Sequence, residues 1–160
     1  VLFLDYEADE SEIMGRAELF GEVPDDFHYM NAKGEPFHDL LPEVRREIRR
    51  LGIGFLIVDS AGLACGGEPE KAEGAIKYFN ALNSLGVSSL TTAHVTKEDT
   101  KEKYPFGSIF WHNGARMTRN VQGDRDLGIL HLGFVCQKAN TLRVRPQPFG
   151  LPARFGSSWV

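Results

Sequence analysis

Phe55-Leu-Ile-Val-Asp59-Ser60 is the stretch of sequence that decides the fold class. Four apolar residues, two of them β-branched, run directly into a carboxylate and a hydroxyl, and glycines lie on both sides of the run. A short apolar run between turn residues is typical of a strand buried on both faces, in the centre of a parallel sheet covered by helices. We therefore expect an α/β fold with Asp59 at the carboxyl end of a central strand, where open α/β sheets bind ligands.

An acid in this place has two interpretations. A buried carboxylate is costly unless a cation comes to it, and a hydrated Mg2+ that carries a nucleotide is a common partner. Alternatively, Asp59 is a strand-ending residue that caps the following turn. These six residues leave both interpretations open.

Two further apolar runs predict neighbouring strands, at residues 1–7 and 87–94. The first ends in Glu7 and the second in His94, so Glu7, Asp59 and His94 should meet at one rim of the sheet. Each has an ordinary alternative, respectively an acidic loop, a turn cap and a core histidine. Together they suit nucleotide hydrolysis, which needs a carboxylate to polarise water, an acid to hold the water shell of Mg2+ and a polar sensor near the γ-phosphate.

The rest of the chain predicts helices between these strands and further strands after them. We treat residues 1–160 as a single domain with a Pro-rich tail at 146–160, which limits further regular structure there. Helices are expected at 11–20, closed by Gly21, and at 39–51, capped by Asp39 and stopped by Gly52. A third helix is expected between the glycine-rich loop Ala61–Pro69 and Gly86. Its inward residues would be Ala72, Ile76, Phe79, Leu82 and Leu85. Strands are expected at 27–30 and, partly antiparallel and added to one sheet edge, at 115–122, 128–137 and 142–145.

The charge distribution is uneven along the chain. Residues 1–100 carry 9 Lys and Arg against 19 Asp and Glu, whereas residues 101–160 carry 9 against 3. The basic C-terminal portion is a candidate to face phosphate, nucleic acid or an acidic neighbouring subunit. The cluster Arg45, Arg46, Arg49 and Arg50 is a candidate nucleic-acid site. In both cases a solvated surface is the ordinary alternative.

Composition favours a soluble, cytoplasmic protein. No run approaches the roughly 18 apolar residues of a membrane span, and no signal peptide opens the chain. Cys65 and Cys136 lack metal-ligand spacing, which favours reduced thiols. Val1 opens the chain within an apolar run without Met, so we expect a cut end.

Four stretches in order resemble a known family: VLFLDYE, FLIVDSAGLACGGEPE, LTTAHVTK and PFGSIFWHNGAR, which begin at residues 1, 55, 90 and 105. Over about residues 1–145 the chain resembles the RecA-like ATPases of the plasmid and phage RepA type, relatives of the hexameric replicative helicases. The resemblance implies a twisted, mainly parallel sheet flanked by helices, with antiparallel strands near the C-terminus. It also implies an ATP-driven ring helicase or DNA-remodelling ATPase that uses ATP and Mg2+ and binds single-stranded DNA. In such a homo-oligomer the active site lies between subunits.

The resemblance also implies roles for individual residues. Glu7 matches the general base. Asp59 matches the acid that holds Mg2+ through water, and Ser60 lies beside it. His94 matches the sensor that couples the γ-phosphate to the DNA-binding loops. Arg116 matches an arginine finger acting on the neighbouring subunit and Lys138 a second such cation, with Arg119 and Arg143 as competitors. Lys97, Lys101 and Lys103 are the candidate DNA-binding lysines in the polar loop of residues 95–107.

The family's phosphate-binding motif, GxxxxGK[ST], is absent from this sequence. Without its backbone N–H groups, lysine and hydroxyl, most of the binding energy for a triphosphate is missing. We therefore expect part of an ATPase, inactive alone, whose missing strand would lie beside the Asp59 strand and whose exposed sheet edges would favour dimerisation or swapping. Two other classes stay open: a non-catalytic DNA-binding or assembly module, and a metal-dependent hydrolase with Asp59, His94 and Glu7 as direct ligands.

Overall fold

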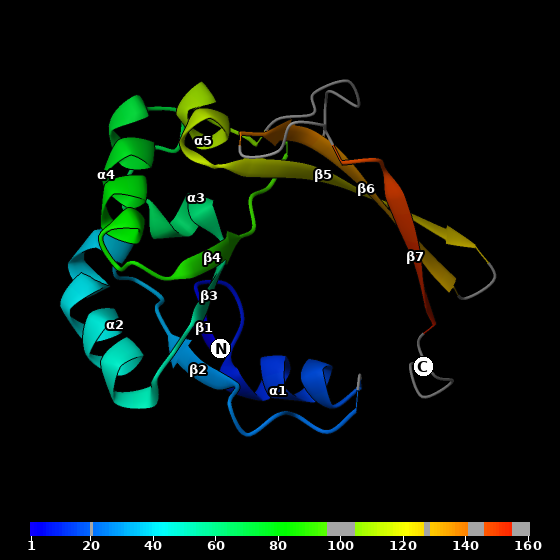
Figure 1. Cartoon of the computed structure of the whole chain (residues 1–160), viewed down its shortest axis with the longest axis horizontal. Helices are drawn as coiled ribbons and strands as arrows, with labels where there is room; N and C mark the ends of the chain where they lie inside the picture. The colour runs from blue at the N-terminus through cyan, green and yellow to red at the C-terminus, as the bar shows by residue number, and fades with distance from the viewer. Residues whose placement is uncertain (20, 96–104, 127–128, 141–145, 155–160) are drawn as a thin grey trace. The chain divides into compact units, whose positions relative to one another are not determined.

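Four short parallel strands form the sheet of the first part of the chain (Figure 1). In spatial order they are β2 (His28–Asn31), β1 (Leu2–Asp5), β3 (Phe55–Asp59) and β4 (Ser88–Thr91). The computed structural model describes residues 1–19, 21–95, 105–126, 129–140 and 146–154. Its helices are α1 (Glu10–Glu18), α2 (Phe37–Leu51), α3 (Ala61–Ala64), α4 (Ala72–Asn83) and α5 (Ile109–Gly114). The predicted α/β class with a parallel sheet flanked by helices is confirmed.

The chain divides into two compact units. The first comprises residues 1–96 and 105–114, and the second comprises residues 97–104 and 115–160. All four parallel strands and all five helices belong to the first unit, so the rim where β1, β3 and β4 end lies within that unit.

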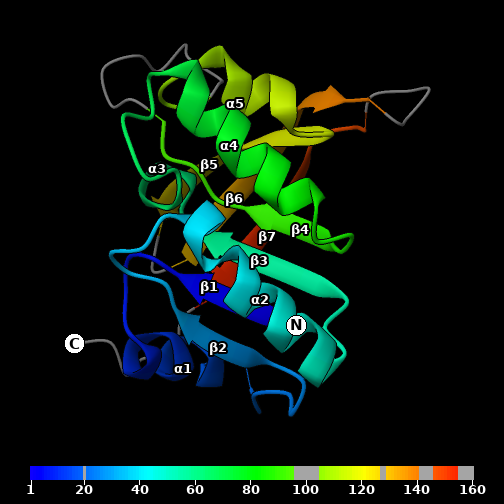
Figure 2. The ribbon, with the colours of Figure 1, turned by 90° about the vertical axis from the view of Figure 1, so that its left-hand side faces the viewer.

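One face of the parallel sheet is buried beneath α2 and α4, which lie across it side by side (Figure 2). Leu4, Leu56 and Val58 point to this face and are fully buried. The helices contribute Phe37 from α2 and Tyr78 from α4, whose ring centroids are 5.2 Å apart. Burial of this apolar layer is the main term that stabilises the first unit.

The opposite face of β3 is more open than the apolar run predicted. Phe55 is 36% exposed and Ile57 is half-buried, whereas the residues that alternate with them are buried. The prediction of burial on both faces is therefore wrong for the described structure. Since a continuous apolar run looks the same whether helices cover one face or two, the sequence alone could not decide this.

The topology also corrects the predicted position of a missing strand. β3 is hydrogen-bonded to β1 on one side and to β4 on the other, so no place beside it is open. Among the described strands, the free edges of the sheet are those of β2 and β4. An additional strand would therefore join at β4 or β2 and not next to Asp59.

Two helices differ in detail from their predicted limits and faces. α2 begins at Phe37 after Pro36 and not at Asp39, and its first residue, Phe37, is fully buried. It ends as predicted at Gly52, whose φ of 64° a glycine adopts without strain. On α4 the predicted inward residue Ile76 is 43% exposed, and Tyr78 is buried instead.

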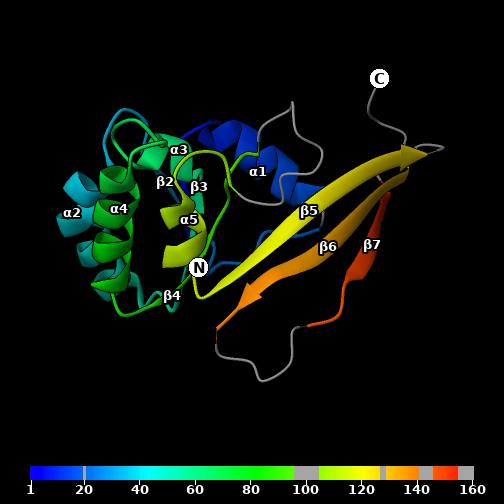
Figure 3. The same cartoon turned by 90° about the horizontal axis from the view of Figure 1, so that it is seen from above.

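Three antiparallel strands form the sheet of the second unit (Figure 3). They are β5 (Met117–Asp126), β6 (Ile129–Ala139) and β7 (Phe149–Arg154). They were predicted to extend the parallel sheet, but they pair only with one another in the described part of the chain. β7 also lies in the tail where we expected little regular structure. Pro152, which has no backbone N–H to donate, is tolerated because β7 is an edge strand that pairs only with β6 among the described strands.

No helix in the described ranges is long and apolar enough to cross a membrane. Cys65 and Cys136 are free thiols, and both are buried. Residues 142–145, predicted as a strand, lie outside the described residues.

Replacing Leu56 with alanine should lower the free energy of unfolding by about 2–5 kcal/mol, because its side chain is fully buried in the sheet face under the helices. Leu90→Ala is the matched control. Leu90 pairs with Ile57 on the other face and is 53% exposed, so its loss should cost less than about 0.5 kcal/mol. Denaturant unfolding measures both. Equal losses would contradict burial on one face only.

Candidate functional site

The carboxyl ends of three adjacent strands bring together the residues that the sequence singled out. Asp59 is the last residue of β3, Glu7 follows the end of β1 by two residues, and His94 follows the end of β4 by three. The register of the sheet explains their proximity, since Asp5 of β1 lies opposite Asp59 of β3. Parallel strands paired in this way end at the same edge.

Glu7 is the centre of the polar contacts at this edge. The Ser60 hydroxyl donates a hydrogen bond to Glu7 Oε1, and His94 Nε2 lies 2.9 Å from the same oxygen. Ser60 is buried, whereas the side chain of Glu7 is 34% exposed and that of His94 is 73% exposed. The three residues therefore form a bridge from the buried end of β3 to solvent.

The hydrogen bond from Ser60, followed by that from His94, holds the pKa of Glu7 below its ordinary value of 4.5, against an opposing effect of burial. Glu7 is therefore a carboxylate at neutral pH. Since a carboxylate only accepts hydrogen bonds, His94 Nε2 carries the proton in this contact. Both donors use Oε1, and Oε2 remains the oxygen that can receive a proton from a water molecule.

Asp59 makes its side-chain contact across the sheet. Thr92 Oγ1, just beyond β4, donates to Asp59 Oδ1, and the Asp59 carbonyl accepts the N–H of Tyr6 at 2.7 Å. The following helix α3 has Ser60 as its N-cap residue, without a side-chain cap. The turn-cap interpretation of Asp59 is therefore not what the structure shows. The peptide bond between Asp59 and Ser60 is cis.

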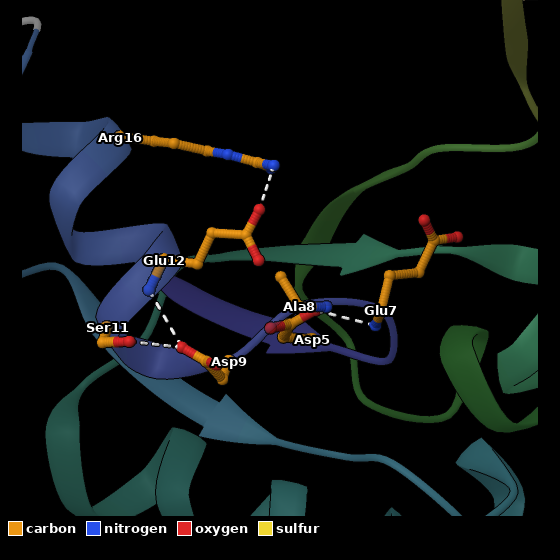
Figure 4. Close-up of polar contacts among 7 residues, drawn as sticks. All are labelled: Asp5, Glu7, Ala8, Asp9, Ser11, Glu12 and Arg16. Carbon is orange, nitrogen blue, oxygen red and sulfur yellow. Dashed lines mark hydrogen bonds and ion pairs between the residues drawn. The ribbon is translucent and has the colours of Figure 1, made fainter.

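Sequence reasoning missed Asp5, which is fully buried. Its Oδ1 accepts the N–H groups of Glu7 and Ala8, both at 2.9 Å, and its Oδ2 accepts the hydroxyl of Tyr29 at 3.0 Å. Figure 4 shows Asp5 inside the turn and the Glu7 carboxylate pointing away from it. An Asp whose side chain accepts backbone N–H groups two and three residues later is a known turn signal. In LFLDYE this signal is hidden, because the apolar run predicts only the end of a strand.

The predicted basic residues are not all described. Arg116 is exposed and precedes β5, and Lys138 lies in β6, so both belong to the second unit. Arg119 lies over the ring of Phe149, 5.1 Å from its centroid. Lys97, Lys101, Lys103 and Arg143 lie outside the described residues.

Direct metal binding by Glu7, Asp59 and His94 does not fit the geometry. No group of three or more His, Cys, Asp or Glu residues that could hold a metal ion occurs in the described part of the chain. Glu7 and His94 are hydrogen-bonded to each other instead. The chemistry of Asp59, a half-buried carboxylate at the rim, does fit a contact to the water shell of Mg2+, an ion that prefers oxygen ligands and keeps several waters.

Comparison with solved structures identifies the fold of this chain. No family model and no curated protein matches the sequence. This chain is similar to the crystal structure of a KaiC-like protein from the hyperthermophilic archaeon Pyrococcus horikoshii OT3, with a TM-score of 0.71 and 14% sequence identity. The match covers 93% of this chain and 69% of the chain of that protein. At this identity the likeness shows the fold alone, and that fold is RecA-like.

Replacing Ser60 with alanine should raise the pKa of Glu7 toward 4.5, and His94→Ala should raise it less, because the Ser60 bond is the larger cause of the lowering. Carboxyl 13C NMR measures both. Since the pKa is lowered in the folded state, these contacts stabilise the protein above about pH 4.5, and that stabilisation is lost as the pH falls through the lowered pKa. Glu7→Gln, which does not titrate, is the control. An unchanged pKa in both alanine variants would contradict the contacts.

Proposed function

We propose that this chain is the water-activating part of a RecA-like ATPase. The observation that supports this most is the Glu7 carboxylate, held by Ser60 and His94 at the rim where β1, β3 and β4 end. An ionised, partly exposed carboxylate with a fixed position beside a second acid is the arrangement that hydrolysis of a nucleotide requires.

In this proposal each residue has a separate task. Glu7 accepts the proton of the attacking water at Oε2, while Ser60 and His94 fix its orientation through Oε1. Asp59, oriented by Thr92, holds the water shell of Mg2+. A bound Mg2+ supplies charge neutralisation on the phosphates. His94, which is mostly exposed, is in a position to respond to what binds above the rim.

The sequence contains no GxxxxGK[ST] motif, so the phosphate cradle would come from a segment outside these 160 residues. Among the described strands, β4 is paired only with β3, so its other edge is the place where a further strand would join. By this reasoning the chain by itself binds ATP weakly and does not turn it over.

The finer proposal is a ring-forming helicase or DNA-remodelling ATPase that couples hydrolysis to single-stranded DNA. The excess of basic residues after residue 100 supports a phosphate-bearing partner. Lys97, Lys101 and Lys103 remain the proposed DNA contacts, and Lys138 remains a proposed second cation at the subunit boundary.

Of the two candidate finger arginines that the structure describes, Arg116 suits the role better than Arg119. Its side chain is exposed, whereas Arg119 is half-buried against the Phe149 ring. A finger must reach a neighbouring subunit, and an arginine already engaged in its own sheet would have to leave that contact first.

Calorimetric titration of Mg2+-ATP tests the proposal. We expect no measurable heat with the 160-residue chain. In a longer form that includes a phosphate-binding loop, we expect binding that Asp59→Ala weakens. There, Glu7→Gln should bind ATP normally but lose turnover by about 10²- to 10⁴-fold. Full turnover in Glu7→Gln would disprove the role of Glu7, and salt-dependent binding of single-stranded DNA without any nucleotide effect would favour a non-catalytic module.

Replacing Arg116 with alanine in that longer form should lower turnover by about 10³-fold or more without loss of stability, because its side chain is exposed. Arg119→Ala is the matched control. It should cost about 0.5–1 kcal/mol of stability through loss of the contact with Phe149 and leave turnover near normal. The opposite result would assign the finger to Arg119.

A further inference from the structure

We propose that Asp5 is a positioning residue for Glu7: its buried carboxylate closes the turn after β1 and thereby aims the Glu7 side chain at Ser60 and His94. The catalytic meaning of this role rests on the proposed function of Glu7. The geometric role does not, because it concerns only contacts within the first unit.

The two oxygens of Asp5 have different tasks. Oδ1 accepts the N–H of Glu7 and the N–H of Ala8, which lie two and three residues later in the chain. This pattern defines an Asx turn, in which a side chain replaces a backbone carbonyl. Oδ2 accepts the hydroxyl of Tyr29 from the neighbouring strand β2, and burial together with this bond raises the pKa of Tyr29 to about 12. Asp5 therefore ties the turn to the sheet.

The chemistry of the position argues for this task. Asp5 lies on the face of β1 opposite Leu2 and Leu4, yet it is as fully buried as they are. A fully buried carboxylate is costly unless its oxygens are satisfied, and here both oxygens accept hydrogen bonds. The cost is balanced by the hydrogen bonds from Glu7, Ala8 and Tyr29.

The backbone on both sides of Glu7 is thereby fixed. The Tyr6 N–H donates to the Asp59 carbonyl of β3 at 2.7 Å, and the next N–H along the chain, that of Glu7, donates to Asp5. A glutamate side chain has several rotatable bonds, so the position of its Cα decides what its carboxylate can reach. Without the turn, Oε1 would not be held within reach of both Ser60 and His94. A misplacement of about 1 Å is enough to impair catalysis.

The test follows the ring 15N resonance of His94 by NMR in the 160-residue chain without nucleotide, because His94 Nε2 reports the contact with Glu7. Asp5→Ala should remove the resonance pattern of the hydrogen-bonded Nε2. Asp5→Asn keeps an oxygen that can accept both N–H groups and should restore the pattern. Tyr29→Phe removes a bond from the same carboxylate without opening the turn, so it should also keep the pattern.

Two results of this experiment would overturn the proposal. One is a folded Asp5→Ala variant with an unchanged His94 resonance, and the other is a Tyr29→Phe variant that loses the resonance as fully as Asp5→Ala does. The second result would mean that burial of the carboxylate, and not the turn, sets the site.

If Asp5→Ala does not fold, hydrogen exchange of the backbone amides in the unaltered chain tests whether Asp5 closes the turn. The N–H groups of Glu7 and Ala8 should exchange at least about tenfold more slowly than in an unfolded chain, and exchange at the unfolded rate would refute the turn. No nucleotide enters these measurements. A failure of the proposed ATPase function would therefore appear in the calorimetry and turnover experiments, and a failure of the positioning role would appear only here.

Discussion

The in-register parallel pairing of β1 with β3 is the constraint on which the rest of the first unit depends. Leu2 lies opposite Leu56 and Leu4 opposite Val58, and all four side chains are buried under the same helices. Because side chains alternate between faces, a shift of either strand by one residue would turn this apolar set to the other side of the sheet. The core thus selects the register, and the register places the residues after Asp5 beside Asp59.

The polar rim is a consequence of that pairing. Ser60 is buried at the end of β3, so its hydroxyl needs a partner, and Glu7 is the acceptor that the register brings to it. Hydrogen bonds to a carboxylate are stronger than those between neutral groups, and the partly buried setting weakens competition from water. Glu7 is in this way the residue that satisfies the buried hydroxyl, and in the proposed function it is also the residue that accepts a proton from water.

Residues 106–111 are hydrogen-bonded both to His94 and to the loop between α3 and α4. The Phe106 N–H donates to the His94 carbonyl at 2.7 Å, so the chain returns to His94 after the segment that follows β4. The Pro69 carbonyl, in the loop between α3 and α4, accepts both the Ser108 N–H at 2.9 Å and the Trp111 indole N–H at 3.0 Å. Gly107 lies so close to this carbonyl that a Cβ there would be 2.4 Å from it, which requires a glycine. These hydrogen bonds hold residues 106–111 against His94 and Pro69.

The sequence by itself determined the local features: the three apolar runs, the polar residues at their carboxyl ends, and the stop of α2 at Gly52. These follow from the side chains of a few consecutive residues, and Glu7, Ser60, Asp59 and His94 could be named from them. Only the tertiary structure decided that one face of β3 is open, that Tyr78 and not Ile76 is buried, and that the last strands form their own sheet. It also decided that Asp5 closes the turn that contains Glu7. Each of these depends on which distant segment packs or pairs against which, and strand register and helix rotation are chosen by the summed burial of the whole unit, which no local pattern contains.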